Sequence, residues 1–446
     1  MAVLNILKKV AGKYNDSSLI IRILIGIVIG VILTVIAPGW TWIGTLGSLF
    51  VGALKAIAPI LVFVLVSSAL AQGASKMDRR FGSVIFYYML TTFLAGAIAV
   101  VVSFLFPQTL LLEDAATAET IPQGIGEVMY NLLMKIVDNP VSALMNANYI
   151  GILVWAALLG CAMKRFASEP SRKMLADLAS AVSQVVRWII NLAPFGILGL
   201  VFNAVRENGV AIFTTYGRLV VLLLACMLGV SLIVNALVSG LSLRRNPYPL
   251  ILKCLRESGI TAFFTRSSAA NIPINMALCE KLGLDEDLYS VSIPLGSTIN
   301  MDGAAITISV MTLACANTLN IAVDLPTAVI LSVLSTFAAC GASGVAGGSL
   351  LLIPMACSLF GISNDIAMQV VAVGFIIGVV QDSLETMLNS SGDVVFAATA
   401  EYRQWLKEGR RLPGFMYSAK ERASMGIDKS FPGDTKQELE EAKQEA

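Results

Sequence analysis

The amino-acid sequence predicts an all-α membrane protein with eight transmembrane helices and two re-entrant helical hairpins. Three observations support this fold class. The chain has 446 residues, of which 56% are hydrophobic and only 14% charged, a composition typical of polytopic membrane proteins. Its apolar runs reach or exceed the roughly 20 residues that cross a bilayer. Two further apolar segments are interrupted near their middle by small and hydroxylated residues.

Eight apolar segments are the predicted crossings. They cover residues 18–37, 42–71, 82–106, 141–163, 176–204, 212–241, 288–319 and 363–400. Lys8, Lys9 and Lys13 precede the first segment, as in a signal peptide. That segment is nearer 20 residues than the roughly 7–15 of a cleavable signal, so we expect an uncleaved first helix.

Positive charges determine the expected orientation. Lys and Arg are concentrated in three connections, at 73–80, 164–173 and 242–249. The connection at 107–130 has four carboxylates and no Lys or Arg. Because positively charged loops remain in the cytoplasm, both termini are expected there. Eight crossings place both termini in the cytoplasm only if each of the two broken segments, 250–277 and 326–357, enters and leaves the membrane on the same side.

We therefore expect a chain in four parts. These are a cytoplasmic segment at 1–17, six helices at 18–245, a core of two hairpins and two helices at 246–400, and a cytoplasmic tail at 401–446.

Each hairpin is followed by a helix that we expect to be interrupted. The hairpin tips are TRSSAANIP at 265–273 and CGASGVAGGS at 340–349, and the breaks are NMDG at 300–303 and NSSG near 389–392. The first hairpin enters from inside and the second from outside, which makes the two halves inverted repeats. Discontinuous helices in inverted repeats indicate the binding site of a secondary transporter.

The last apolar segment carries an unusual polar face. Asp382, Glu385, Thr386, Asn389 and Asp393 share an arc of about 100° on a helix. Each ionised residue near the centre of a membrane helix costs about 2.5 to 3.5 kcal/mol, so such an arc needs cations, partners or trapped water. This favours an ion and solute site over a seam for helix packing.

The composition argues against other functions. The chain has no histidine, its seven cysteines lie scattered in apolar segments, and it has no nucleotide-binding GxxxxGK[ST] motif. Most enzymatic sites and an ATP-driven pump are therefore disfavoured, and a net charge of +1 suggests no nucleic-acid partner. A channel remains an alternative. Oxygen donors at the two breaks suit a hard monovalent cation, and sodium is the simplest choice.

These motifs together resemble the dicarboxylate/amino acid:cation symporter family, over residues 18 to 400. The likeness is closest to its bacterial serine/threonine:sodium branch, on the segments CLRESG, FFTRSSAANIP and CGASGVAGGSLLLIP. The resemblance implies a homotrimer in the inner membrane. Within each subunit the first, second, fourth and fifth crossings would form a scaffold, and the remainder would move across the bilayer like an elevator.

The resemblance also implies site residues. Asp382 would bind the substrate ammonium and Asn389 its carboxylate. The full substrate set would be Ser267, Ser268, Val345, Gly347, Ser349, Asp382, Glu385, Thr386 and Asn389. One cation site would use Gly296, Asn300, Asn389 and Asp393. A second would use Thr298, Ala339, Cys340 and Ala342. A third would use Tyr88, Thr91, Thr92, Asn300 and Asp302.

Two positions depart from the members that carry acidic substrates. This chain has Glu385 where they have an arginine, and Ala304 where they have a threonine. Two carboxylates about 4 Å apart repel by about 4 kcal/mol at an effective dielectric constant of 20. We therefore expect sodium-coupled import of neutral amino acids, above all L-serine and L-threonine. The alternatives are an ion pair between Glu385 and Arg266 without substrate contact, and a proton- or sodium-coupled carrier of dicarboxylates or acidic amino acids.

Overall fold

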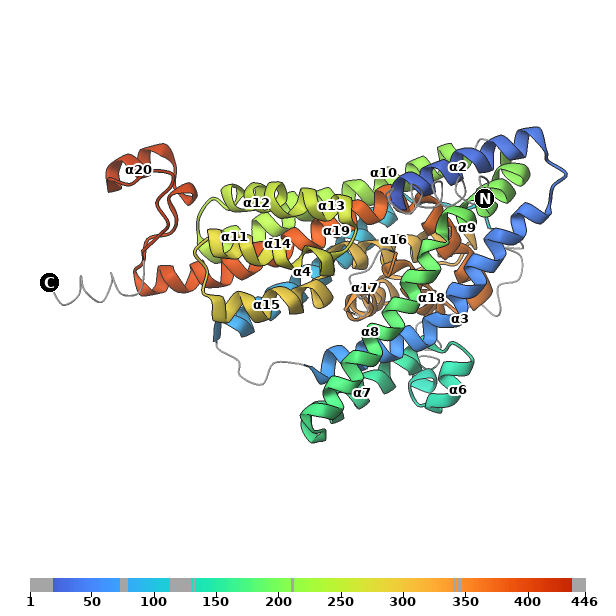
Figure 1. Cartoon of the computed structure of the whole chain (residues 1–446), viewed down its shortest axis with the longest axis horizontal. Coiled ribbons are helices and arrows are strands. Elements are labelled where there is room, and N and C mark those ends of the chain that lie inside the picture. Colours follow the sequence, from blue (N-terminus) through green and yellow to red (C-terminus); the bar gives the residue numbers. More distant parts are fainter. Residues whose placement is uncertain are drawn as a thin grey trace, which may run out of the picture.

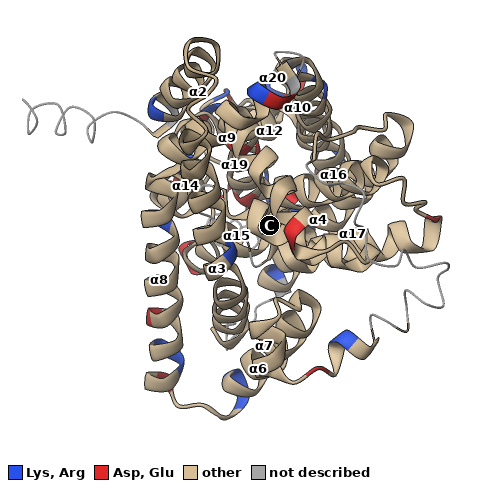
Figure 2. Cartoon of the chain, turned by 90° about the vertical axis from the view of Figure 1, so that its right-hand side faces the viewer, with Lys and Arg blue, Asp and Glu red and all other residues tan. Residues whose placement is uncertain are grey.

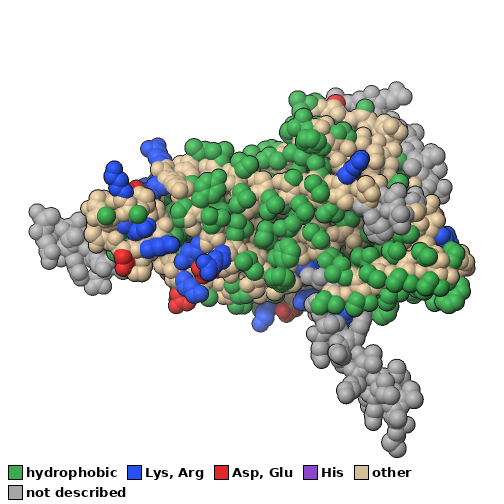
Figure 3. Space-filling model, turned by 90° about the horizontal axis from the view of Figure 1, so that it is seen from above, with side chains coloured by type: hydrophobic (Ala, Val, Ile, Leu, Met, Phe, Trp, Pro, Cys, Tyr) green, Lys and Arg blue, Asp and Glu red, His purple; other side chains and the backbone are tan. Residues whose placement is uncertain are grey.

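The computed structural model describes residues 19–72, 79–112, 130, 133–209, 212–340, 342 and 347–434. Every regular element in these residues is a helix. Six helices are long and apolar enough to cross a membrane, and a seventh span results if one bent pair is counted as a single crossing. Figure 3 shows apolar side chains over the middle of the molecule and charged side chains gathered at one end. The protein is therefore a multi-pass membrane protein.

Five helices pack together, and we call them the scaffold group. They are α2 (Leu19–Ile36), α3 (Trp42–Ala71), α7 (Tyr149–Phe166), α8 (Glu169–Asn191) and α9 (Ala193–Asn208). α3 contacts α7, α8 and α9, and α2 packs on α9. In Figure 1 this group lies on the right. Lys and Arg mark the connection between α7 and α8 at the bottom of Figure 2.

Two predicted spans of the scaffold group differ in the structure. The segment 176–204 is two helices bent by 51° at Leu192, because Pro194 lies in the first turn of α9 and cannot donate a backbone hydrogen bond to α8. The segment 141–163 starts as the short α6 (Pro140–Met145) and continues as α7. Ala147 takes a positive φ between them and Asn148 caps α7.

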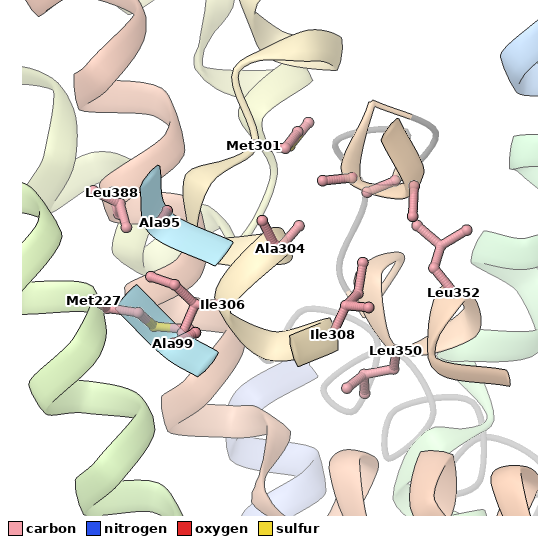
Figure 4. Close-up of a cluster of buried hydrophobic side chains, with 14 of the residues drawn as sticks. Ala95, Ala99, Met227, Met301, Ala304, Ile306, Ile308, Leu350, Leu352 and Leu388 are labelled. Atoms are coloured by element: carbon pink, nitrogen blue, oxygen red, sulfur yellow. The ribbon is translucent and has the colours of Figure 1, made fainter. Parts of the chain in front are cut away.

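The remaining membrane helices form a core group. They are α4 (Arg79–Leu105), α10 (Ile212–Gly229), α11 (Asn235–Leu243), α15 (Glu286–Ile299), α16 (Asp302–Thr318) and α19 (Asn364–Glu408). The predicted NMDG interruption is confirmed, since the chain leaves helical geometry at Asn300 and Met301 between α15 and α16. α16 lies at the centre, where Ile306 and Ala304 pack among Ala95, Met227 and Leu388 (Figure 4).

Two helix-turn-helix units complete the core group, and we call them hairpin 1 and hairpin 2. Hairpin 1 consists of α12 (Tyr248–Cys254), a π-helical turn (Leu255–Gly259), α13 (Ile260–Thr265) and α14 (Ser268–Lys281). Hairpin 2 consists of α17 (Leu325–Ala339), two 3₁₀ turns (Ser349–Leu352 and Ser358–Phe360) and α18 (Ile353–Cys357). Both units pack on α16 or α19.

α19 contradicts the predicted break near 389–392. It is one continuous helix of 45 residues. Ser391 donates its hydroxyl to the Met387 carbonyl, within the helix. Gly392 does not end the helix but allows a close approach, because an added Cβ would lie 2.9 Å from the Asn300 Nδ2 atom. The predicted polar face therefore stays on one rigid helix.

A second close approach joins α16 to α19 and yields a prediction. A Cβ at Gly303 would lie 2.8 Å from the Glu385 Cα atom, which is backbone and cannot rotate away. We expect Gly303→Ala to destabilise the protein by about 1–3 kcal/mol, seen as a lower melting temperature in detergent. Gly378→Ala is the control, because a Cβ there meets no atom within 4 Å. Equal melting temperatures for the two variants would contradict the close approach.

The chain after α19 folds back onto the core group as a C-terminal clasp (residues 409–434). It includes α20 (Ala419–Met425) and lies at the left end of the molecule in Figure 1, beyond the C-terminal end of α19. Glu421 pairs with Arg245 at 3.0 Å, and Lys253 of hairpin 1 lies over the Phe415 ring at 4.9 Å. Asp434 accepts hydrogen bonds from Arg411 at both carboxylate oxygens. The predicted tail is thus partly an ordered structure.

The clasp should open in acid. Burial alone would raise the pKa of Asp434. Hydrogen bonds from Arg411 nevertheless hold this pKa below its usual value. A carboxyl group whose pKa is lowered on folding stabilises the folded state at any pH above its pKa in the unfolded chain, which is about 4. This stabilisation is lost as the pH falls through the pKa of the folded state. We expect Asp434→Asn to speed amide exchange across residues 410–434 at pH 7. The exposed control Lys420→Gln should exchange like the parent protein, and an unchanged Asp434→Asn would refute this role.

Candidate functional site

The predicted polar face of α19 is buried in the core group. Asp382, Glu385, Thr386, Asn389 and Asp393 are each 5% exposed or less. One helix therefore brings five polar side chains to the interior, where each needs a partner.

Asp382 connects the tips of both hairpins. Its Oδ2 atom lies 2.6 Å from Arg266 Nε in hairpin 1, and its Oδ1 accepts a hydrogen bond of 3.1 Å from the Gly347 N–H in hairpin 2. Arg266 has a left-handed backbone, with φ of 52°, at the turn of hairpin 1. Thr386 donates its hydroxyl to the Asp382 carbonyl. Arg266 thus forms an ion pair with the same carboxylate to which the resemblance assigns the substrate ammonium.

Glu385 does not pair with Arg266, so that alternative is wrong. Its Oε2 atom accepts hydrogen bonds from Thr307 at 2.7 Å, Gln381 at 2.6 Å and Ser349 at 2.9 Å. Three donors on one oxygen hold the carboxyl group in a fixed orientation. Thr307 and Gln381 were not among the site residues predicted from the sequence. Gln381 could have been found, because it lies one helical turn before Glu385 on the same face.

Asn389 lies against the start of α16. Its Oδ1 accepts a hydrogen bond of 2.7 Å from the Gly303 N–H, and its Nδ2 lies 3.3 Å from the Met301 sulfur. Ser267 caps α14 through Ala270 N–H, and the adjacent Ser268 is 2% exposed. Val345 lies outside the described residues.

The first predicted cation set is brought together. Asn300 Nδ2 donates to Asp393 Oδ1 at 2.9 Å and to the Asn389 carbonyl at 3.1 Å. A Cβ at Gly296 would lie 2.6 Å from Asp393 Oδ1, so any larger residue there would displace the Asp393 carboxylate. Tyr88 donates its hydroxyl to the Asp393 carbonyl at 3.0 Å.

The third predicted set is brought together in part around Asp302, which is fully buried, whereas Tyr88 bonds the Asp393 carbonyl. Thr92 donates its hydroxyl to Asp302 Oδ1 at 3.0 Å. Thr91 instead bonds the Tyr87 carbonyl of its own helix. Within the described part of the chain, three buried oxygens here have no hydrogen-bond partner, and these are Asn300 Oδ1, Asp302 Oδ2 and Asp393 Oδ2. Unpartnered buried oxygens of this kind suit a hard cation.

The second predicted set is more loosely assembled. Cys340 Sγ lies 3.7 Å from the Ile299 carbonyl, next to Thr298. Thr298 itself bonds the Leu295 carbonyl, and the Ala339 carbonyl accepts the Ala342 N–H. The described residues contain no cluster of three or more His, Cys, Asp or Glu that could hold a metal ion. Any cation here would depend on carbonyl, hydroxyl and amide oxygens.

A cavity of about 930 Å³ reaches this region between the two helix groups. Its lining includes Arg266 and Ser267 at the tip of hairpin 1, Thr298 of α15, Gln72 at the end of α3 and Arg187 of α8. The tip of hairpin 1 is therefore accessible from one side, although Asp382 and Glu385 are covered.

Comparison with known proteins matches residues 19–402 to the sodium:dicarboxylate symporter family. The serine/threonine transporter SstT of Bifidobacterium adolescentis is 65% identical over 419 residues, which are 94% of this chain and 97% of that protein. A transporter of the same name from Streptococcus thermophilus is 57% identical over 402 residues, covering 90% and 100% of the two chains. Another from Streptococcus agalactiae is 58% identical over 396 residues, covering 89% and 98%. The chain belongs to the sodium:dicarboxylate symporter family.

Proposed function

We propose that this protein is a sodium-coupled symporter that imports L-serine and L-threonine across the bacterial inner membrane. The observation that carries the proposal is the buried face of α19, on which Asp382, Glu385 and Asp393 lie within one continuous helix. Relatives of 57–65% identity are named serine/threonine transporters. A zwitterion and a cation would together neutralise these carboxylates inside the membrane.

The substrate would bind between the two hairpin tips. Its ammonium would take the Asp382 carboxylate from Arg266, and its carboxylate would accept hydrogen bonds from Asn389 and the backbone near Ser268. Releasing Arg266 and the Gly347 N–H would loosen both tips from α19. Substrate binding is thereby linked to the positions of both hairpins.

Glu385 would select the substrate class. Its carboxylate is fixed by three donors, two of them from α16 and hairpin 2. A second carboxylate on the substrate would meet this charge, at a cost of about 4 kcal/mol for a separation of 4 Å and a dielectric constant of 20. A substrate hydroxyl could instead donate a hydrogen bond to Glu385. This favours serine and threonine over the dicarboxylates of the family name.

Substitution of Glu385 by glutamine tests the selection. We expect Glu385→Gln to retain serine uptake and to make aspartate a competitor. The apparent affinity for aspartate should be at least about tenfold, and at most about a thousandfold, higher than in the parent protein. The measurement is inhibition of labelled-serine uptake by unlabelled aspartate. Ser383→Ala is the control, because its hydroxyl bonds only the Val379 carbonyl of the same helix among the described residues. If aspartate fails equally to inhibit serine uptake by both variants, Glu385 does not select the substrate.

Sodium would bind at the three unpartnered oxygens around Asn300, Asp302 and Asp393. Carboxylates, amides and carbonyls are the donors that a small hard cation takes. Asn389 is shared by the cation and substrate regions, and Asn300 donates a hydrogen bond to its carbonyl. Occupation of one region would therefore shape the other, which is the physical basis of coupling.

We also propose eight crossings and two re-entrant hairpins, with an elevator-like movement of the core group. α2 would be the eighth crossing. The tip of hairpin 1 shares a cavity with Leu19 and Gln72, at the expected cytoplasmic ends of α2 and α3. At the other end, Asp365 at the start of α19 pairs with Lys55, well inside α3. Both contacts suit a core group displaced toward the cytoplasm.

Assembly and topology follow from the resemblance and the charge pattern. The scaffold group exposes many apolar side chains, among them Ile25, Val28 and Leu49, which suits lipid and a homotrimer contact. The basic connection between α7 and α8 would be cytoplasmic, as would both termini.

Uptake into proteoliposomes tests the proposed function. Labelled serine should accumulate with an inward sodium gradient and not with a matched potassium gradient, and threonine should compete while aspartate should not. Accumulation driven by a proton gradient without sodium, or competition by aspartate, would instead indicate a proton-coupled or dicarboxylate carrier.

A further inference from the structure

Asn235 lies at an unusual position in an otherwise apolar membrane helix. α10 passes through a π-helical turn at Val230–Val234 before α11 begins at Asn235, whose N–H bonds the Val230 carbonyl five residues back. One extra residue in such a turn shifts the face of every later residue by about 100°, and π-helical turns often occur at functional positions. The turn directs Asn235 inward, where it is only 3% exposed.

The neighbours of Asn235 come from the core of the site. A Cβ on Gly392 would lie 3.9 Å from Asn235 Nδ2 and 2.9 Å from Asn300 Nδ2. Both side-chain amides therefore lie against Gly392, where α19 has no side chain. The Asn235 side chain also lies beside the Asp302 carboxylate. Three elements, α11, the break before α16, and α19, thus converge on one point.

The oxygens at this point lack partners. Asn235 Oδ1, Asn300 Oδ1 and Asp302 Oδ2 are all buried and accept no hydrogen bond from any residue that the structure describes. Leaving a buried polar atom unpaired is costly, and one unpaired oxygen can arise from local packing. Two amide oxygens and one carboxylate oxygen at one point are better explained by a shared ligand that prefers oxygen. A single carboxylate among neutral oxygens suits a monovalent cation.

We propose that Asn235 is a ligand of the cation that Asp302 holds, contributing its side-chain oxygen from α11. The inference rests on the proposed sodium coupling and adds a residue and a helix to the site. Asparagine suits this role because it offers an oxygen without a second negative charge beside Asp302. The π-helical turn provides the geometry, since a regular helix would turn this residue away.

Sodium-dependent stabilisation of the purified protein tests the inference without transport. Ligand binding raises the melting temperature by mass action, so the sodium concentration of half-maximal stabilisation can be measured without serine. We expect Asn235→Ala to raise that concentration about tenfold or more, and Asn235→Ser, which keeps one oxygen, to raise it less. Ser239→Ala is the matched control one helical turn on, because its hydroxyl bonds Thr399.

Uptake measurements separate a ligand from a packing residue. For a ligand, excess sodium restores serine uptake by Asn235→Ala, and the serine concentration at half-maximal rate then lies within about twofold of the parent value. The inference would be overturned if Asn235→Ala or Asn235→Ser reached half-maximal stabilisation at the same sodium concentration as the parent protein. Loss of uptake that no sodium concentration restores would also overturn it. If Asn235→Ala does not fold, Asn235→Ser alone decides by the same criteria. A parent protein that sodium fails to stabilise would overturn the proposed function as well.

Discussion

Asp382→Asn is expected to lower serine uptake by at least a hundredfold at subsaturating serine. The Asp382 carboxylate is 2% exposed and is the only charged partner proposed for the substrate ammonium. Losing a charge-assisted bond in a buried site costs about 3 kcal/mol or more, which corresponds to over two decades in affinity. The measurement is the initial rate of labelled-serine uptake with a saturating sodium gradient.

A paired variant separates binding from folding at this position. Asp382→Asn leaves Arg266 buried and unpaired, and breaking a buried ion pair in this way destabilises by about 3–5 kcal/mol. Combining it with Arg266→Gln removes both charges and should restore the melting temperature. If uptake returns together with stability, Asp382 is structural and does not bind the ammonium. If stability returns alone, the binding role stands.

Asp393→Asn is expected to abolish the response to sodium. Asp393 is fully buried, its Oδ1 is bonded to Asn300, and its Oδ2 is unpartnered among the described residues. An amide has the same size but no charge, and a cation about 2.5 Å away loses several kcal/mol of attraction even at an effective dielectric constant of 20. We expect the half-saturating sodium concentration to rise by more than a hundredfold, both in uptake and in thermal stabilisation.

Glu408→Gln is the control on the same helix, because Glu408 lies at its end and bonds Gln404 and Arg410. It should keep the sodium response of the parent protein. An Asp393→Asn variant that still responds to sodium at the parent concentration would show that this carboxylate is not a cation ligand.

The polar face of α19 could be predicted from sequence because helical periodicity alone places its residues together. Asp382 and Asp393 needed only the spacing of one segment. Their partners could not be predicted in this way. Arg266 and Asp382 are 116 residues apart, and both Glu385 and Asp382 were within conceivable reach of Arg266. Only packing of hairpin 1 against α19 decides which carboxylate receives the guanidinium.

The wrong prediction at Gly392 has a related cause. Glycine both breaks helices and allows close packing, and the sequence does not distinguish these uses. In α19 the missing Cβ makes room for Asn300. The significance of Asn235 was likewise hidden, because the π-helical turn before it shifts the helical phase and has no simple sequence signature.

The measurement that tests the account most directly is equilibrium binding of serine to the purified protein across a range of sodium concentrations. If the carboxylate face binds cation and zwitterion together, the serine dissociation constant must fall as sodium rises. By linkage, serine must tighten sodium binding by the same factor. Serine binding of equal strength in sodium and in potassium would contradict the account, since the binding of the two ligands would then not be coupled.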